Sequence, residues 1–276
     1  VTGFLGSHIL KSLLEISEVI FLKRSCSDVW RIRELLSGVT HYDADKTPLE
    51  NIFKEHRIDG IVHTATEYGR NKGADEIVAS NVIFPLKLLR LSIANKISFF
   101  LNTDTFFNSE GVASSHLFDY TLSKKQFEAW LKVYKNRGPR IINLKLSHFY
   151  GPRDGSEKFV PQMLSKMLRH EPRIELTEGK QRRDFIYVDD VVKVYRLSVE
   201  KIDSIRDPYL ELEVGTGRST TIKDFLKIMQ RLTQSRSVLD FGKLPYRDNE
   251  IMEHHAKTDG LMRTLGWKPE ISIEEG

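Results

Sequence analysis

Thr2-Gly3-Phe4-Leu5-Gly6-Ser7-His8-Ile9-Leu10 decides the fold, because this stretch combines a glycine turn with the start of an amphipathic helix. Gly3 and Gly6 lie where a turn between a strand and a helix brings bare backbone N–H groups against a phosphate. We therefore expect a dinucleotide pyrophosphate to be held by Thr2, Gly3, Phe4, Leu5 and Gly6. Two glycines three residues apart also form simple tight turns, so the surrounding sequence has to decide between these interpretations.

The residues expected before such a turn are a strand and a further glycine, and both would lie upstream of Val1. A doubly wound sheet that lacks its central first strand leaves two neighbouring strands with unpaired edges. We therefore predict that the natural protein has a hydrophobic strand ending in Gly before Val1, so that this sequence is truncated at its start.

The rest of the chain alternates between strand-like and helix-like segments. Short runs rich in β-branched or aromatic residues predict strands at 19–22, 60–64, 97–102 and 140–146. Apolar residues at helical spacing predict helices at 49–56, 75–95 and 118–136. This alternation indicates the α/β class and predicts a Rossmann-type, doubly wound parallel sheet with helices on both faces.

The pattern loosens after Gly151-Pro152. Strands predicted at 173–176, 184–188, 210–214 and 238–241 mix there with helices predicted at 160–169, 190–200 and 222–233. We predict a cofactor-binding Rossmann domain over residues 1–152. A smaller, mostly substrate-binding region is expected over 153–276, with some of its segments returning to the Rossmann sheet.

The composition limits the classes of function. The 276 residues carry a formal net charge of +4, and basic residues alternate with acidic ones, which argues against a nucleic-acid partner. No apolar run approaches the roughly 20 residues of a membrane span, and the single cysteine, Cys26, fits a reducing compartment. We expect a cytoplasmic protein without a membrane contact. No histidine or cysteine pair has metal-ligand spacing, so we expect no metal site.

The end of the second predicted strand bears on the choice of cofactor. Lys23 and Arg24 stand where an NAD-preferring site usually has an acidic residue, with Ser25 beside them. Arginine binds phosphate through paired N–H groups, which suits the 2′-phosphate of NADP(H). We therefore expect NADP(H), with NAD(H) as the alternative. Asp45 is expected to accept from the adenine amino group, and Lys46 beside it is assigned to the same cofactor site.

Tyr120 and Lys124 form the candidate catalytic pair. The i, i+4 spacing places the phenol and the ammonium on one face of a helix, and a nearby cation is expected to lower the phenol pKa from about 10. Tyr120 would then serve as a general acid/base. A Tyr-x-x-x-Lys spacing also arises by accident on helices, so its weight comes from Asn102-Thr103-Asp104-Thr105 at the preceding strand end.

With these motifs the chain resembles the extended short-chain dehydrogenase/reductases, the nucleotide-sugar epimerase/dehydratase family, over nearly its whole length. The opening is similar to the family's Gly-x-x-Gly-x-x-Gly turn without its first glycine. The other similar segments are Asp59-Gly60-Ile61-Val62-His63-Thr64-Ala65-Thr66, Asn81-Val82, Leu146-Ser147-His148-Phe149-Tyr150-Gly151-Pro152, Arg183-Asp184-Phe185-Ile186-Tyr187-Val188-Asp189-Asp190-Val191, residues 211–217 and Leu265-Gly266-Trp267-Lys268-Pro269. His148 departs from the family pattern, which usually has Asn there, and Glu213 likewise replaces an Asn.

The resemblance implies roles for individual residues. Thr103 would hydrogen-bond the reacting sugar oxygen, Tyr120 would pass the proton, and Lys124 would tune Tyr120 and hold the nicotinamide ribose. The family's cofactor contacts would extend to Thr64, Ala65, Thr66 and Asn81. A nucleotide-diphosphate sugar would be the partner, with its diphosphate on Arg183 and Arg247. Further substrate contacts are expected from Tyr68, Asp104, Thr105 and His148, whereas His116 is interpreted as a surface-loop histidine.

The triplet Thr103-Asp104-Thr105 separates the family's reactions. Its 4,6-dehydratases carry Thr-Asp-Glu here, and a threonine hydroxyl cannot replace the glutamate as a base for a carbon-bound proton. Residues 102–108 also resemble the family's reductases of CDP-linked 4-keto-3,6-dideoxyhexoses of O-antigen. We therefore expect an NADPH-dependent reductase of a nucleotide-linked 4-keto-deoxyhexose.

Two other functions stay open. One is an NAD-dependent C4 epimerase, and the other is a non-catalytic NADP(H)-binding sensor or scaffold. The family often pairs through helices that correspond to 75–95 and 118–136, so a homodimer is a hypothesis.

Overall fold

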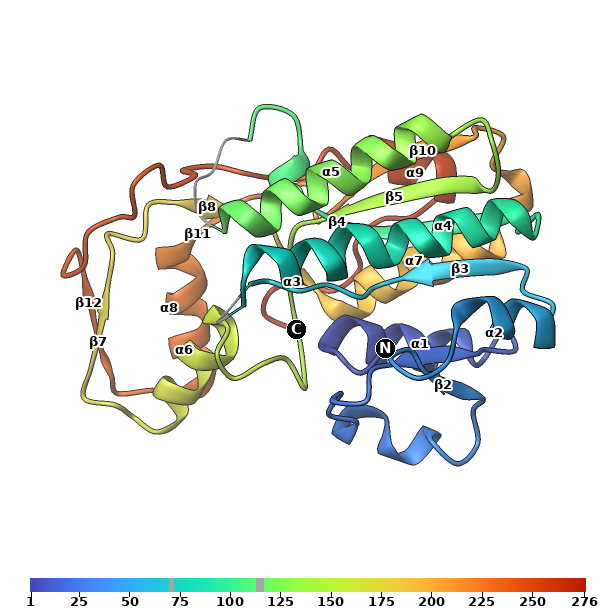
Figure 1. The fold of residues 1–276 in the computed structure, drawn as a ribbon. Helices are drawn as coiled ribbons and strands as arrows, with labels where there is room; N and C mark the ends of the chain where they lie inside the picture. Colours follow the sequence, from blue (N-terminus) through green and yellow to red (C-terminus); the bar gives the residue numbers. More distant parts are fainter. Residues whose placement is uncertain (70–71, 113–116) are drawn as a thin grey trace.

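The computed structural model describes residues 1–69, 72–112 and 117–276. Its centre is a four-stranded parallel sheet in the order β10-β5-β4-β3 (Figure 1). The strands are β3 (Gly60–His63), β4 (Phe99–Thr105), β5 (Arg140–Leu146) and β10 (Tyr209–Val214). The parallel α/β sheet predicted from the alternation is therefore confirmed.

A second parallel ladder joins β1 (Phe21–Lys23) to β2 (His41–Asp43). Within the described ranges, β1 pairs only with β2, and β3 pairs only with β4. The predicted continuous sheet is therefore present as two ladders. The 3₁₀ turn η1 (Trp30–Leu35) connects β1 and β2, and α2 (Leu49–Glu55) follows β2.

Side chains that alternate along the central strands explain the two helical layers. Phe100 and Ile141 face α4 (Phe84–Ala94) and α5 (Phe118–Tyr134) in one apolar cluster. The next residues along the two strands, Leu101 and Ile142, belong to a cluster with α1 (Phe4–Leu13) and α7 (Val188–Glu200). The sheet is thus buried on both faces, as expected for parallel strands.

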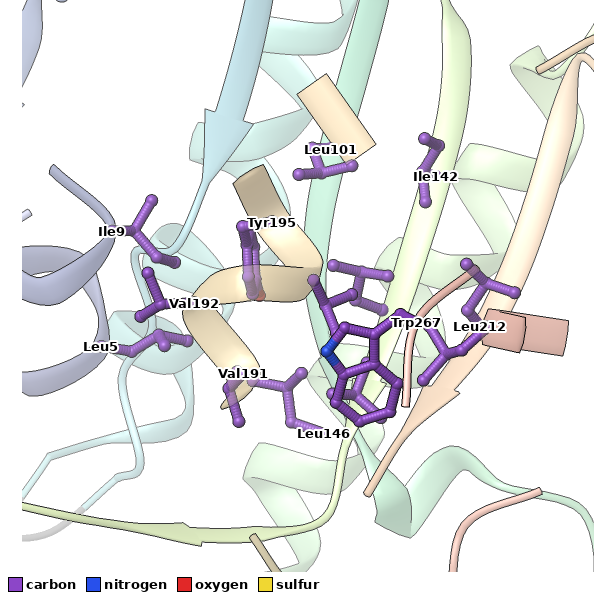
Figure 2. Close-up of a cluster of buried hydrophobic side chains, with 14 of the residues drawn as sticks. Leu5, Ile9, Leu101, Ile142, Leu146, Val191, Val192, Tyr195, Leu212 and Trp267 are labelled. Carbon is purple, nitrogen blue, oxygen red and sulfur yellow. The ribbon is translucent and has the colours of Figure 1, made fainter. Parts of the chain in front are cut away.

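The cluster between the sheet, α1 and α7 also receives the C-terminal part of the chain. Figure 2 shows Tyr195 of α7 with Leu5 and Ile9 on one side and Leu101 of β4 on another. Trp267 follows α9 (Asp259–Leu265) and packs in the same cluster. Segments beyond residue 152 therefore complete the core of the first 150 residues.

A smaller lobe has its own apolar core. It contains α6 (Phe159–Leu168), α8 (Ile222–Thr233) and the parallel pair β7 (Arg173–Leu176) and β12 (Val238–Phe241), which lie together in Figure 1. Short pairs connect this lobe to the sheet region. They are β6 (His148–Tyr150) with β9 (Phe185–Tyr187), and β8 (Arg182–Arg183) with β11 (Thr220–Thr221).

The helix predicted over 75–95 is three segments in the structure. They are α3 (Ala74–Val78), the π-helical turn η2 (Ala79–Ile83) and α4. An 18-residue window within these 21 residues has a mean hydropathy of 1.6, so by length and composition the segment would be able to cross a membrane. Core helices of globular proteins pass the same test, and α4 packs on the sheet through Leu88 and Leu89.

Two further 3₁₀ turns follow regular elements, η3 (Phe106–Asn108) after β4 and η4 (Ile202–Ser204) after α7. The first of these continues directly from Thr105 and turns the chain at the carboxyl end of the central strand.

Candidate active site

A cavity of about 2710 Å³ runs along the carboxyl ends of the parallel strands and between β1 and β3. Its lining includes predicted site residues from several separate sequence motifs. The predicted site residues that line it are Thr2, Gly3, Phe4, Leu5, Gly6, Arg24, Asp45, Thr64, Ala65, Thr66, Tyr68, Thr103, Asp104, Thr105, Tyr120, Lys124, His148, Arg183 and Arg247. The three predicted residues that do not line it are Ser25, Lys46 and Asn81.

The glycine turn forms one end of this cleft. Gly3 is the N-cap of α1, with extended backbone and no side-chain cap, and the first helical turn carries no acidic residue. A Cβ at Gly6 would lie 2.7 Å from Cα of Val1 and 3.0 Å from Oγ1 of Thr64, so only glycine fits without a shift. A Cβ at Gly3 would meet no atom of the described residues within 4 Å. The uncapped N–H groups of the first turn therefore face a cleft that suits an anionic pyrophosphate.

The residues predicted to contact the 2′-phosphate and adenine end of the cofactor lie partly in the cleft and partly in a local network of hydrogen bonds. Arg24 and Asp45 line the cleft. Ser25 instead donates its hydroxyl to Oδ2 of Asp43 at 2.6 Å and its backbone N–H to Oδ2 of Asp45 at 2.8 Å. Lys46 approaches the same Asp43 carboxylate at 3.9 Å. Both side chains turn to Asp43, a carboxylate that the motifs did not identify, and their contact with the cofactor stays a prediction.

Asn81 is buried next to the cleft and does not line it. Its side chain accepts from the backbone N–H of Glu67 at 2.7 Å and donates to the Glu67 carbonyl at 2.8 Å. The same amide donates to Oγ of Ser123 at 3.0 Å. Asn81 is buried, and its contact with the cofactor stays a prediction. It ties the loop after β3 to helix α5, one residue before Lys124.

Tyr120 lies buried at the middle of the cleft, near the first turn of α5. Its ring centroid is 4.9 Å from that of Tyr68. Burial, with smaller contributions from Tyr68 and Asp104, raises the pKa of Tyr120 well above its ordinary value of 10, while a hydrogen bond from Thr105 opposes the rise. The expected net lowering of this pKa is therefore wrong for this structure, because burial is the largest effect and raises it. The phenol keeps its proton at neutral pH.

Lys124 is held beside Tyr120 by the end of β4. Its Nζ donates to the Thr103 carbonyl at 2.8 Å, and burial lowers its pKa to about 8, against an opposing effect of Asp104. Asp104 is itself buried, and burial raises its pKa to about 6. Its carboxylate accepts from Nδ2 of Asn108 at 2.8 Å and from Nδ2 of Asn143 at 2.9 Å. A buried carboxylate thus lies near the buried ammonium.

The Thr103 side chain points to α7. Its Oγ1 lies 2.6 Å from the phenol oxygen of Tyr195, which is fully buried. Tyr195 was missed because the sequence shows only an aromatic residue at a core position of an amphipathic helix. No local motif distinguishes such a tyrosine from a packing residue.

The far end of the cleft carries two arginines among acidic residues. Arg183 and Arg247 both line it, and the Arg183 guanidinium forms an ion pair with the Glu250 carboxylate. His148 replaces the usual Asn of the family, and its ring centroid is 4.5 Å from that of Phe106. Burial, followed by the charge of Arg183, lowers the pKa of His148 to about 3, so the imidazole is neutral.

Lys158, just before α6, is a further cation that the sequence did not reveal. Its Nζ forms an ion pair with Asp154 at 2.8 Å and lies 5.4 Å from the ring centroid of Phe4 and 5.5 Å from that of Phe149. It therefore connects the glycine turn with the start of the smaller lobe. His116 lies outside the described residues.

Comparisons with known proteins place this geometry in context. The model of the "NAD dependent epimerase/dehydratase family" matches residues 1–215. The whole chain is 39% identical to a CDP-abequose synthase of Salmonella muenchen, covering 92% of it, and 35% identical to one of Salmonella typhimurium, covering 93%. The fold is similar to the crystal structure of a UDP-glucose 4-epimerase from Thermotoga maritima with UDP-glucose. That comparison has a TM-score of 0.85 and 26% identity and covers all of this chain and 93% of the other.

Proposed function

Because this chain belongs to the NAD dependent epimerase/dehydratase family and is an NAD(P)-dependent oxidoreductase-type enzyme that modifies nucleotide sugars, we propose that it reduces a nucleotide-linked 4-keto-deoxyhexose with NADPH. Two features support the choice of reduction. Tyr120 is a protonated phenol in the cleft, and Thr105 stands where a dehydratase has its glutamate base. Both features suit protonation of a keto oxygen better than removal of a proton from carbon.

The chemistry assigns one task to each residue. A bound NADPH supplies the hydride that adds to the C4 carbonyl carbon. The carbonyl oxygen takes the proton of the Tyr120 phenol, and the Thr103 hydroxyl hydrogen-bonds the same oxygen. The nearby Lys124 ammonium stabilises the phenolate that results, which regains its proton from solvent.

The cleft fits the cofactor on structural grounds. The uncapped first turn of α1 offers N–H groups to the pyrophosphate, and the lack of a side chain at Gly6 lets this turn pack closely against Val1 and Thr64. Thr64, Ala65 and Thr66 follow β3 along the same cleft. Arg24 at the cleft wall supports NADPH, since its guanidinium suits a 2′-phosphate. Asp43 and Asp45 beside it would favour a ribose hydroxyl, so NAD(H) stays the alternative.

The substrate end is proposed for the nucleotide diphosphate. Arg183 and Arg247 reach the cleft from the smaller lobe and would bind phosphate oxygens through paired N–H groups. The CDP-abequose synthases among the relatives support a CDP-linked sugar. Tyr68, Asp104 and His148 are proposed to shape the sugar site, with His148 as a neutral imidazole.

The proposed function is tested by turnover with defined substrates. The enzyme is incubated with CDP-linked and dTDP-linked 4-keto sugars and NADPH, and the loss of NADPH absorbance is followed. We expect stoichiometric oxidation of NADPH with at least one keto sugar and a product that carries a new C4 hydroxyl. Interconversion of 4-epimers with catalytic NAD, without oxidation of NADPH, would establish the epimerase instead. Binding of NADPH without any turnover on the panel would favour the sensor or scaffold.

We propose that the protein is a homodimer in the cytoplasm. Apolar side chains are exposed along α5, at Leu122, Trp130 and Val133, and next to α4 at Ile83. This face supports a homodimer formed by these helices. The single cysteine, Cys26, supports the cytoplasm as the compartment. We also propose that most of the substrate-binding region begins near residue 152.

A further inference from the structure

The pair Thr103–Tyr195 suggests a function for a residue that no motif identifies. The two hydroxyl oxygens are 2.6 Å apart, and Tyr195 lies on α7 in an otherwise apolar cluster (Figure 2). Phenylalanine would fill the same apolar space, so packing alone does not account for the hydroxyl. We propose that Tyr195 is a positioning residue that donates its proton to Oγ1 of Thr103 and thereby directs the Thr103 proton into the cleft. This proposal rests on the proposed reduction of a keto sugar.

Proton counting fixes the direction of the hydrogen bond. Each hydroxyl has one proton to donate, and each can also accept. Within the described ranges, Thr103 is the one hydrogen-bond partner of the Tyr195 phenol, and Tyr195 has no exposed surface. If Thr103 donated instead, the Tyr195 proton would be buried without an acceptor. Tyr195 is therefore the donor.

The consequence for Thr103 follows from its other contacts. Its carbonyl oxygen accepts from Nζ of Lys124 at 2.8 Å, so the residue is held from α5 as well as from α7. Thr103 is partly exposed and lines the cleft. Once its oxygen accepts from Tyr195, its own proton is free to donate toward the cleft.

A donor in this position matches a keto oxygen. A carbonyl oxygen has two lone pairs and accepts two hydrogen bonds, one from Tyr120 and one from Thr103 in the proposed reaction. A hydroxyl oriented before the substrate arrives loses less freedom on reaching the transition state. Tyr195 on α7, Thr103 and the keto oxygen thus form a chain of hydrogen bonds.

The inference is tested by a double-mutant cycle with Tyr195→Phe, Thr103→Val and the double variant. Thr103→Val is expected to lower kcat about 100-fold, the loss typical of removing one such donor. Tyr195→Phe should lower kcat about tenfold in the parent enzyme, with little change in KM or in the NADPH dissociation constant. In the Thr103→Val background, Tyr195→Phe should have no further effect on kcat, because it acts through the missing hydroxyl.

Ser198→Ala is the matched control. Ser198 lies on α7, is fully buried, and donates its hydroxyl to the Val194 carbonyl at 2.7 Å, away from the cleft. It should keep the parental kcat even if the melting temperature falls. The inference is wrong if Tyr195→Phe keeps the parental kcat. It is equally wrong if that change lowers kcat by the same factor with and without the Thr103 hydroxyl.

Two further measurements keep the test decisive. If Tyr195→Phe does not fold, Thr103→Ser replaces it. This variant keeps the hydroxyl that Tyr195 orients and should stay near parental kcat, whereas a rate as low as that of Thr103→Val would contradict the inference. If the parent enzyme epimerises sugars instead of reducing them, the proposed function fails. The same cycle is then measured on epimerisation, which places a C4 oxygen against the same hydroxyl.

Discussion

Asp104→Asn should move the alkaline limb of the kcat/KM pH profile to lower pH. Lys124 has a pKa of about 8 in the structure, and Asp104 is the neighbouring charge that raises it against the effect of burial. The ammonium is present below this value and is lost as the pH rises through it, so kcat/KM should fall above about pH 8. Removing one opposite charge typically changes such a pKa by at least one unit. The alkaline limb should therefore move down by about one pH unit.

The size of the effect follows from the fraction of Lys124 that carries a proton. A shift of the limb from about pH 8 to about pH 7 lowers that fraction about twofold at pH 7 and about fivefold at pH 8. The fold should tolerate the change. Nδ2 of Asn108 donates to the Asp104 carboxylate, and Oδ1 of Asn108 is buried without a partner among the described residues. If the Asn108 amide turns over, its oxygen can accept from the new amide group.

The assay is kcat/KM for the keto sugar across a pH range that brackets both limbs. Glu128→Gln is the control, because Glu128 is also buried on α5, four residues after Lys124, but forms ion pairs with Lys132 and Lys145. Removing the Glu128 charge should leave the alkaline limb of kcat/KM at the parental pH. An unchanged limb in Asp104→Asn would refute the reasoning, as would an equal shift in both variants.

Three other expectations concern the cofactor and the helical face. Gly6→Ala should weaken NADPH binding and lower the melting temperature, since its Cβ would lie 2.7 Å from Cα of Val1; an unchanged NADPH titration and melting curve would contradict the tight approach. Arg24→Ala should raise the NADPH dissociation constant about tenfold and leave that for NADH almost unchanged, as expected for loss of a charged hydrogen bond. Equal effects on both cofactors would remove the 2′-phosphate assignment. Leu122→Asp should convert a dimer to a monomer in light scattering, and a parent protein that is already monomeric would disprove the proposed interface.

Hydrophobic patterning was sufficient for the regular elements. The spacing predicted the bounds of β5 and α8 as the structure has them, because both have long apolar patterns with clear ends. It failed for β6, which has only three residues, and it merged α3, η2 and α4 into one helix. A π-helical turn leaves the apolar periodicity almost intact, so the sequence does not mark it.

The site was predictable where a motif lies on one element and failed where partners come from distant elements. Tyr120 and Lys124 share one helix, so their spacing was visible in the sequence. Asp43 and Glu250 are acidic partners that only the folded chain brings to Ser25 and Arg183. The error in the Tyr120 pKa has the same origin. Spacing reveals a nearby cation, whereas burial, the larger effect here, depends on the complete fold.

Tyr120→Phe tests the central claim most directly. The change keeps the ring beside Tyr68 and removes only the proton that the keto oxygen should receive. Turnover of the keto sugar should fall by at least about 100-fold while the NADPH dissociation constant stays at its parental value. Parental turnover with native cofactor binding would contradict the claim that this phenol is the proton donor.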